Sequence, residues 1–381
     1  MHLALVTNWS PDGRPNSEYA LHLGESLRRA RPDSRITVLA GTPGSGSAAL
    51  AGVTVERAWK HGGLDVAGDL VRSVRRLRPD AVLFNASFNA WGNNISNLSA
   101  FWGMARVARE ARTVVLLHYL PQTLSGTARY RLAPWHRLGI HMACLLAARA
   151  QVVAFTLPRD VAYFGTRYKP QGAVHVEHGL LGPCGSSGFD EPDGTPAVLA
   201  FGYWGPGKNL EGLLESVEQV RGLHLIVAGA SHPRFPGFLE ELRRRYRSPR
   251  VSYLGYIHEG DLPALFRRAR AVVLPYESDS GTSGVMHLAA QHGRAIIATD
   301  LPVIREEAER LGLAVRFYAG ANGLRAELER LHDEAGLLAE GDQNLEAVAR
   351  LSPEGVGERW WEIISAPAAR TPVATPIFLE R

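Results

Sequence analysis

The sequence has little cysteine and no long apolar run. Only Cys144 and Cys184 occur among 381 residues, too few for a disulfide framework or a zinc knuckle, so we expect two buried structural thiols. No stretch approaches the roughly 18–20 consecutive apolar residues that a membrane-spanning helix needs. The first residues, MHLALVTNWSPDG, lack the basic and apolar regions of a secretion signal. Together these absences predict a cytoplasmic protein.

Several functional motifs are also missing. The loop at 8–17 contains no GxGxxG, the glycine pattern of dinucleotide-binding domains, which argues against an NAD-dependent oxidoreductase. No cluster of His, Cys, Asp and Glu has the spacing of metal ligands, so we expect neither a metal nor another bound cofactor. No nucleic-acid-binding motif is present, which excludes that partner from the prediction.

Positive charge is concentrated in the first half of the chain. Residues 1–190 contain 21 Lys and Arg against 12 Asp and Glu, a net charge of +9, whereas residues 191–381 contain 21 against 26, a net charge of −5. Most of the excess is arginine, in runs such as RRARPDSR and RSVRRLR. We interpret these runs either as solvated helix faces or as a surface that approaches something anionic, such as a phosphorylated acceptor or a membrane.

Short apolar runs alternate with helical stretches along the first 180 residues. Buried strands that alternate with helices predict a parallel, doubly wound sheet. The expected strands are 3–7, 36–40, 53–58, 81–86, 113–118, 151–156 and 173–179, and the expected helices are 18–30, 65–78, 96–111 and 136–149.

A second alternating series follows a segment rich in Gly, Ser and Pro. That segment, 181–196, has no apolar periodicity, which is typical of a connector between domains. The expected strands of the second series are 197–202, 223–229, 251–256, 271–276, 295–299 and 314–319, and the expected helices are 209–220, 235–246, 259–269, 283–292, 302–311, 321–340 and 353–364.

The pattern therefore predicts an α/β protein made of two Rossmann-like domains. We place the first domain in residues 1–180, a linker in 181–196 and the second domain in 197–350, and we expect residues 351–381 to return toward the first domain. Ligands of such sheets bind at the carboxyl ends of the strands, so we expect an interdomain cleft.

The segment FGYWGPGKNLEGLLES (201–216) carries the strongest local pattern. A strand is expected to end at Gly202, a Gly/Pro turn follows, and Lys208 precedes a helix. A lysine beside a helix N-terminus can bind a phosphate and neutralise a diphosphate leaving group. The alternative is a solvent-exposed lysine at an ordinary helix start.

The segment LPYESDSGTSGVMHLAAQHGRAIIATD (274–300) has a similar arrangement. Its loop of small and hydroxylated residues leads into a helix; small residues let backbone N–H groups approach an anion, although Thr282 or Ser283 can also cap the helix. Glu277 and Asp279 either accept hydrogen bonds from sugar or ribose hydroxyls or are simply solvated. The expected phosphate-binding positions are Ser280, Gly281, Thr282, Ser283, Gly284 and Val285.

Polar side chains also follow strands of the first domain. His118 and His178 each stand at a strand end, where they are either structural or part of a site. Segment 84–102 combines amides with two tryptophans, which suits the hydroxyls and CH faces of a sugar, or else forms a polar turn over core tryptophans. The candidate acceptor-binding residues are Arg14, Asn16, Tyr19, Asn85, Asn89, Asn93 and His178.

Taken together, these motifs resemble the retaining family-4 glycosyltransferases (glycosyl transferases group 1) of the GT-B fold. GYWGPGKN is similar to the family's GRLxxEKG segment, with Lys208 at its lysine and Tyr203 at its arginine. HLAAQHGRAIIATD is similar to the end of the family's Glu-x7-Glu motif, with Gly293 in register and with Ser280 and Leu288 at the two glutamate positions. The chain looks like a variant subgroup without the glutamate pair.

The resemblance implies a fold and a reaction. In a GT-B enzyme the second domain binds a nucleoside-diphosphate sugar as co-substrate, and the first binds a small-molecule, lipid-linked or glycan acceptor. Transfer proceeds with retention and without a metal, by front-face attack in which the leaving phosphate takes the acceptor's proton. The implied catalytic residues are His118, Lys208 and Glu277, and the implied donor-binding residues also include Gly202, Tyr203, Gly255 and Tyr256.

Two related functions remain open. A GT-B nucleotide-sugar epimerase is disfavoured by the missing acid cluster, and it would release nucleoside diphosphate without an acceptor. A catalytically silent nucleotide-sugar-binding partner subunit is suggested by the missing glutamates, and it would bind the donor without transfer or hydrolysis. The donor base (UDP, GDP, ADP or TDP), the sugar, the acceptor and the oligomeric state are not specified by the sequence.

We predict that EDTA leaves the rate of sugar transfer unchanged. The reason is that Lys208 and a helix N-terminus, rather than a divalent cation, are expected to neutralise the leaving diphosphate. The measurement is the initial rate of nucleoside diphosphate release with and without the chelator. A strict requirement for a divalent ion would contradict this prediction.

Overall fold

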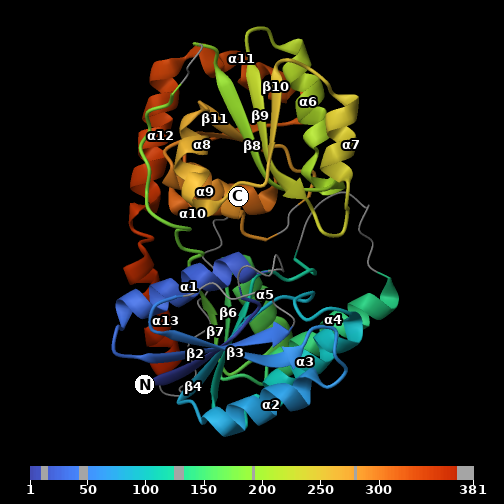
Figure 1. The fold of residues 1–381 in the computed structure, drawn as a ribbon, viewed down its shortest axis with the longest axis vertical. Helices are drawn as coiled ribbons and strands as arrows, with labels where there is room; N and C mark the ends of the chain where they lie inside the picture. Colours follow the sequence, from blue (N-terminus) through green and yellow to red (C-terminus); the bar gives the residue numbers. More distant parts are fainter. Residues whose placement is uncertain (10–15, 43–49, 124–132, 191–193, 279–280, 367–381) are drawn as a thin grey trace. The chain divides into compact units, whose positions relative to one another are not determined.

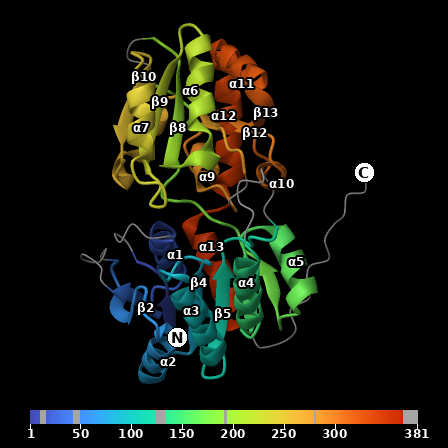
Figure 2. The same ribbon diagram turned by 90° about the vertical axis from the view of Figure 1, so that its right-hand side faces the viewer.

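A computed structural model describes residues 1–9, 16–42, 50–123, 133–190, 194–278 and 281–366. They divide into an N-terminal unit, which holds the described residues up to 179 together with those from 351 onward, and a C-terminal unit of residues 180–350. Each unit contains one parallel sheet with helices on both of its faces (Figures 1 and 2). Within the described ranges, none of the helices combines the length and the apolar character that a membrane crossing requires.

The N-terminal unit is built on a seven-stranded sheet with the order β3-β2-β1-β4-β5-β6-β7. All its strands pair in parallel, and the middle ones are buried along their whole length, because helices cover both faces. The strands are β1 (His2–Val6), β2 (Arg35–Thr42), β3 (Val53–Lys60), β4 (Ala81–Ala86), β5 (Arg112–Leu117), β6 (Val152–Phe155) and β7 (Ala173–His175).

Two groups of helices cover this sheet. The helices α2 (Val66–Leu77), α3 (Asn94–Val107), α4 (Pro134–Ala147) and α5 (Pro158–Tyr168) supply side chains to one hydrophobic core. The helices α1 (Ser17–Ala30) and α13 (Pro353–Ser365) pack on each other. The Trp361 indole donates to the Leu27 carbonyl at 2.8 Å, and the Arg112 guanidinium donates to the Ile363 and Ile364 carbonyls. The last helix of the chain therefore belongs to the first sheet.

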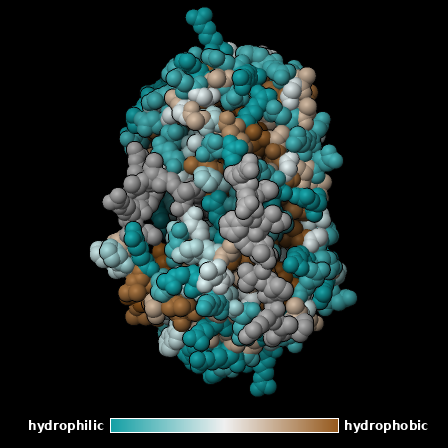
Figure 3. Space-filling model, turned by 180° about the vertical axis from the view of Figure 1, so that it is seen from behind, coloured by the Kyte–Doolittle hydropathy of each residue, from teal (hydrophilic) through white to brown (hydrophobic). Residues whose placement is uncertain are grey.

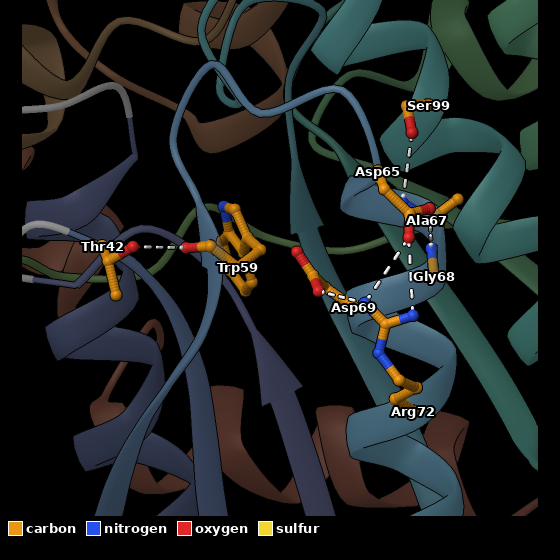
Figure 4. A network of polar contacts seen from close by, with 8 residues as sticks. All are labelled: Thr42, Trp59, Asp65, Ala67, Gly68, Asp69, Arg72 and Ser99. Atoms are coloured by element: carbon orange, nitrogen blue, oxygen red, sulfur yellow. Dashed lines mark hydrogen bonds and ion pairs between the residues drawn. The ribbon is translucent and has the colours of Figure 1, made fainter.

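Local hydrogen bonds fix the start of α2. Asp65 caps the helix by accepting from the Gly68 amide at 2.9 Å, and Arg72 reaches back to the carboxylates of Asp65 and Asp69 (Figure 4). The Ser99 hydroxyl of α3 accepts from the Ala67 amide at 3.1 Å, so the two helices are tied together at this point. The preceding strands are joined by a hydrogen bond from the Thr42 hydroxyl to the Trp59 carbonyl (Figure 4).

The C-terminal unit is built on a six-stranded parallel sheet with the order β10-β9-β8-β11-β12-β13. Its strands are β8 (Ala197–Trp204), β9 (His224–Ser231), β10 (Val251–Gly255), β11 (Ala271–Leu274), β12 (Ala295–Thr299) and β13 (Val315–Tyr318). Its helices are α6 (Leu210–Gln219), α7 (Phe238–Arg245), α8 (Leu262–Arg267), α9 (Gly284–Gln291), α10 (Pro302–Leu311), α11 (Gly320–Glu329) and α12 (Glu334–Ala349).

The segment between the two sheets is held to the C-terminal unit by a buried arginine. The Arg294 guanidinium donates to the carbonyls of Ser186 and Gly188 at 2.6 and 2.9 Å, and Gln291 donates to the Pro183 carbonyl. Burial of the Arg294 guanidinium lowers its pKa to about 10. An arginine with its donors satisfied by backbone carbonyls fixes a chain segment that has no secondary structure of its own.

The expectation of two Rossmann-like domains in tandem is confirmed, and the helix expected at 302–311 is present with those bounds. Some elements differ. The helix α5 was not expected, and the helix expected at 321–340 is two helices, because Asp333 caps a new one by accepting from the Gly336 amide. The strand expected to end at Gly202 continues to Trp204. Of the two cysteines, Cys144 is buried as expected, but Cys184 is exposed.

The surface is mostly hydrophilic on the face seen in Figure 3, where apolar residues gather in a few separate areas. Most large apolar side chains of each unit lie inside, and six of the eight tryptophans are almost completely buried.

We predict that Gly357→Ala destabilises the N-terminal unit. A methyl group at Gly357 would lie 2.0 Å from the Ser26 carbonyl oxygen, so α13 would have to move away from α1. Overpacking of this kind typically costs about 1–3 kcal/mol. Urea titration followed by circular dichroism measures the change. The matched control is Gly139→Ala in α4, where the added methyl group meets no atom of the described residues within 4 Å; equal stability of the two variants would contradict the prediction.

Candidate active site

The strand order of each sheet reverses beside its first strand. In the C-terminal unit β8 lies between β9 and β11, and in the N-terminal unit β1 lies between β2 and β4. The connections that leave two such neighbouring strands go to opposite faces of the sheet, which opens a crevice at the carboxyl ends of the strands. The two strongest sequence motifs follow β8 and β11 directly, so both lie at this point of the C-terminal sheet.

The loop after β8 ends in a single 3₁₀ turn, η2 (Pro206–Lys208), followed by α6. Asn209 between them has a left-handed backbone, with φ of 45°, and its side chain makes no capping hydrogen bond. The first N–H groups of a helix lack partners within the helix. Lys208 therefore stands beside a helix start whose amides are available to an anion.

The loop after β11 leads into α9 through Ser283. The Ser283 hydroxyl accepts from the Met286 amide at 3.3 Å, so the capping interpretation of this residue is confirmed. Gly281 has φ of 90°, a left-handed conformation that glycine adopts without strain. Gly284 and Val285 form the first turn of α9, where helix geometry leaves backbone N–H groups without helical partners.

A buried hydrogen bond between two helices supports the start of α9. The Glu307 carboxylate of α10 contacts the His287 ring at 2.8 Å and accepts from the Ser283 amide at 3.4 Å, and all three groups are buried. The sequence motifs did not single out Glu307 or His287, because the pair joins two helices that are separated by a strand. The pair holds the loop after β11 at a fixed position relative to α10.

The two loops contact each other. The Glu277 amide donates to the Gly207 carbonyl at 3.0 Å, and the Lys208 ammonium lies 3.4 Å from the centre of the Tyr276 ring. A cation over an aromatic face is attracted by the ring's quadrupole, typically by about 0.5–2 kcal/mol. Tyr276 thus holds the lysine side chain at the junction of the two loops.

The loop after β9 adds positive charge beside the same lysine. Burial lowers the pKa of His232, and the positive charges of Arg234 and Lys208 lower it further. The ring's Nδ1 atom also accepts from the Arg234 amide at 3.1 Å, an interaction that requires an unprotonated nitrogen. Neither His232 nor Arg234 was predicted as a site residue. The sequence does not show that the preceding strand, β9, pairs with β8, and this pairing is what brings the loop after β9 beside the loop after β8.

Two glycines permit the close packing of the strands under this site. A methyl group at Gly229 of β9 would lie 1.9 Å from the Gly202 carbonyl oxygen of β8, so the position admits only glycine. A methyl group at Gly202 would be 3.6 Å from the Val285 side chain, which shows that the start of α9 lies next to the end of β8. Tyr203, one residue further along β8, is exposed.

The predicted donor-binding residues Gly255 and Tyr256 lie at the end of an edge strand. Gly255 closes β10 with φ of 73°, and the ring of the exposed Tyr256 stands edge-on to that of His258. Two predicted residues, Arg14 and Ser280, lie outside the described residues, as does Asp279. Their roles stay predictions.

The N-terminal unit gathers three predicted residues at the carboxyl ends of its strands. The Tyr19 ring of α1 lies edge-on to the His118 ring at 4.7 Å between centres and tilted to the His178 ring at 4.9 Å. Asn85, at the end of β4, holds His118: its Oδ1 atom is 2.5 Å from His118 Nε2. Burial lowers the pKa of His118 to about 4, so the ring is neutral at pH 7.

The hydrogen bonds of Asn85 fix the tautomer of His118. The Asn85 amide group donates to the Thr7 hydroxyl and to the Asn16 carbonyl, so its oxygen faces the histidine. His118 Nε2 must then carry the proton, and Nδ1 keeps a lone pair that can accept a hydrogen bond from a hydroxyl.

The remaining asparagines of the N-terminal unit are placed differently. Asn16 has a left-handed backbone, and its buried Nδ2 atom has no acceptor among the residues that the structure describes. Asn89 accepts from the Ser87 hydroxyl at 2.9 Å. Asn93 caps α3 by accepting from the Ser96 amide and also donates to the Gly62 carbonyl, which makes its contribution to the helix start structural. Contact of these side chains with an acceptor stays a prediction.

No group of three or more His, Cys, Asp and Glu side chains that could hold a metal ion occurs among the described residues. The candidate residues of the C-terminal unit supply lysine, arginine, hydroxyl and backbone N–H groups, and those of the N-terminal unit supply imidazole, phenol and amide groups.

The chain matches a known family over its C-terminal unit. Residues 195–334 match the model of the family described as glycosyl transferases group 1. No curated protein matches the chain. The matched range contains every described donor-site residue of the C-terminal unit, from Gly202 to Val285.

Solved structures of similar fold cover nearly the whole chain. A sucrose-phosphate synthase from Thermosynechococcus elongatus has a TM-score of 0.71 at 17% identity, covering 95% of this chain and 98% of its own. HepE of Anabaena, in complex with UDP-glucose, has a TM-score of 0.69 at 15% identity, covering 96% and 100%. WaaG, a glycosyltransferase involved in lipopolysaccharide biosynthesis, has a TM-score of 0.63 at 12% identity, covering 96% and 100%.

These likenesses confirm the GT-B fold expected from the sequence. The family match covers residues 195–334, so this part of the C-terminal unit is similar to glycosyl transferases group 1 domains.

We predict that His118→Gln reduces the loss of stability at low pH. Because the His118 pKa is 6.5 when unperturbed and about 4 in the folded unit, the unfolded chain takes up a proton first as the pH falls. The cost of keeping the ring neutral begins near pH 6.5 and grows until pH 4. Urea titrations across this range give the free energy of unfolding as a function of pH. The slope of that plot should be smaller for His118→Gln than for the wild type by up to about one proton, or ~1.4 kcal/mol per pH unit.

The matched control for this measurement is His332→Gln, which removes an exposed histidine from the C-terminal unit. Identical slopes for His118→Gln and the wild type would contradict the prediction.

Proposed function

We propose that this protein is a retaining glycosyltransferase that moves a sugar from a nucleoside-diphosphate sugar to an acceptor hydroxyl. The observation that carries the proposal is the position of Lys208, which lies over Tyr276 where the loops after β8 and β11 meet. A positive charge at this point of a doubly wound sheet, between two helix starts, suits a diphosphate.

The donor diphosphate is bound by the C-terminal unit. Lys208 neutralises it, and the backbone N–H groups and hydroxyls of residues 281–285 donate to its oxygens. Ser283 contributes mainly by position, because its amide and hydroxyl already bond Glu307 and the first turn of α9. The N–H groups of Gly284 and Val285 are then the principal donors, aided by the positive end of the α9 dipole.

Arg234 supplies the second positive charge of the donor site. The glycosyltransferase family that the motif resembles has an arginine where this chain has Tyr203, and a diphosphate with two charges is poorly neutralised by one lysine. The positive charges of Arg234 and Lys208 both act on the His232 ring, and the Arg234 amide donates to Nδ1 of that ring at 3.1 Å. An unprotonated His232 ring adds no positive charge that would repel them.

The remaining donor contacts are inferred from where their residues lie in the C-terminal unit. The backbone of Gly255 and Tyr256 contacts the base, and Glu277 accepts hydrogen bonds from the sugar. The similar structure of HepE contains UDP-glucose, which makes UDP-sugars the first donors to test. GDP, ADP and TDP conjugates are tested beside them.

The acceptor is bound by the N-terminal unit, at the cluster of Tyr19, His118 and His178. The Nδ1 atom of the neutral His118 ring accepts from a sugar hydroxyl, and Asn85 fixes the ring for that task. The buried Asn16 amide offers a further donor. Neutral polar groups beside aromatic rings match the hydroxyls and CH faces of a carbohydrate.

The reaction balances without a protein nucleophile. The bond between the anomeric carbon and the leaving phosphate oxygen breaks, and the acceptor oxygen bonds the same face of that carbon. The acceptor proton passes to a phosphate oxygen. Lys208 and the amides at the start of α9 stabilise the charge that develops on the leaving diphosphate.

We predict that Lys208→Ala lowers kcat/KM for transfer about 100- to 1000-fold, the usual cost of removing one group that stabilises a developing anion. The unit should remain folded, since Lys208 is not part of the core. Release of nucleoside diphosphate from UDP-glucose and the other conjugates measures the effect.

The matched control is Lys60→Ala, which removes an exposed lysine of β3. Near-wild-type turnover of Lys208→Ala would remove the lysine from the mechanism. Calorimetric binding of a donor by the wild type without turnover would instead identify a silent binding subunit, and release of nucleoside diphosphate without an acceptor would favour an epimerase.

A further inference from the structure

The helices α3 and α4 expose a continuous apolar surface. Ile95, Leu98 and Trp102 of α3 are exposed at spacings of three and four residues, which places them on one side of the helix. The opposite side of α3, with Phe101 and Met104, is buried in the core of the N-terminal unit. The helix α3 therefore has two apolar sides, an inward one that packs in the core and an outward one that is exposed.

The neighbouring helix repeats the arrangement. Trp135, Leu138, Met142 and Leu145 of α4 are exposed at the same spacings, and Cys144 on the inner side is buried. Because α3 and α4 pack on each other, the two exposed sides form one surface, which we call the α3–α4 face. Apolar colour gathers at the lower left of Figure 3, the side on which Figure 1 places these helices when turned by half a rotation.

The tryptophans distinguish this surface from scattered exposed side chains. Of the eight tryptophans in the chain, six are at most 2% exposed, whereas Trp102 is 53% and Trp135 is 70% exposed. Both exposed tryptophans lie on the α3–α4 face. An indole has an apolar body and one N–H donor, so it is stable where an apolar phase meets a polar one.

The charge of the α3–α4 face is mainly positive. Neither helix contains an Asp or Glu, and the exposed Glu110, just after α3, pairs with Arg75 of α2. Arg106 lies over the Trp102 ring at 5.3 Å, and Arg109, Arg137 and Arg149 are exposed at the helix ends and flanks. Apolar side chains with arginines around them complement a surface that is apolar inside and anionic outside.

We propose that the α3–α4 face docks the protein onto a membrane surface of anionic lipids. Burial of the apolar side chains among the acyl chains supplies binding free energy, and the arginines attract the anionic headgroups. The indoles lie at the headgroup level. The helices lie on the membrane and do not cross it.

Charge argues against a second copy of this chain as the occupant. A symmetric dimer through the α3–α4 face would bring two sets of arginines together without carboxylates of these helices to pair them. An anionic bilayer meets the same arginines with opposite charge.

The proposal goes beyond sugar transfer and does not rest on it. Docking is measured by vesicle binding alone, so its failure leaves the donor site untouched, and failure of the Lys208 experiment leaves docking untouched.

The test is co-sedimentation of the full chain with vesicles of phosphatidylcholine, with and without phosphatidylglycerol. We expect binding to the anionic vesicles that weakens as salt screens the arginines. The double variant Trp102→Ser/Trp135→Ser should bind about tenfold or more weakly, and Leu254→Ser, which removes an exposed leucine of β10 in the C-terminal unit, should bind like the wild type. Thermal unfolding shows that each variant is folded.

Two further arms separate charge from apolar contact. Arg106→Glu/Arg137→Glu should abolish the preference for phosphatidylglycerol, whereas Arg243→Glu/Arg244→Glu on α7, with the same change in net charge, should keep it. Lipids with brominated acyl chains should quench the tryptophan fluorescence of the wild type, because Trp102 and Trp135 enter the bilayer, and should not quench that of the serine double variant.

Four outcomes overturn the proposal. The first is that the wild type does not bind anionic vesicles, and the second is that it binds neutral vesicles equally well. The third is that the serine double variant binds as well as the wild type. The fourth is that sedimentation equilibrium shows a dimer of the wild type which the serine substitutions dissociate and which vesicles do not affect.

Discussion

Reversal of the connection direction beside β8 and β1 is the constraint on which the rest of the molecule depends. Each sheet is parallel and covered on both faces, so its central strands, such as β4 and β8, are mostly apolar. Polar groups can gather only at the carboxyl ends, and only where neighbouring connections diverge. Lys208 and the loop after β11 meet at that point in one unit, and Asn85 and Thr7 meet at it in the other.

The residues at these points are held in position by a second set of residues, which are buried. Glu307 holds the Ser283 amide and His287, Tyr276 holds the Lys208 ammonium, and Asn85 sets the proton of His118. Each of these supports comes from a different element than the group it positions. A diphosphate would therefore meet donors that are already in place, and little ordering free energy is spent on binding.

The sequence predicted the type and order of most elements, because apolar runs of strand length and amphipathic helices repeat clearly. It failed where long-range pairing decides. Gly202 was read as a strand end, yet Tyr203 and Trp204 pair with Ala230 and Ser231 of β9 and extend the strand. Lys208 and the glycine and hydroxyl loop could be predicted from local spacing. Glu307, His232 and Arg234 could not, since their partners are distant in sequence and no motif marks them.

The packing of α13 on α1 has a consequence for synthesis. The Trp361 indole and the Leu27 carbonyl that it bonds are 334 residues apart, and the whole C-terminal unit lies between them in the sequence. While the chain emerges from the ribosome, α1 stays uncovered on its outer side until the last helix appears. The first unit to be made is thus the last to be completed, and the C-terminal unit can fold before it.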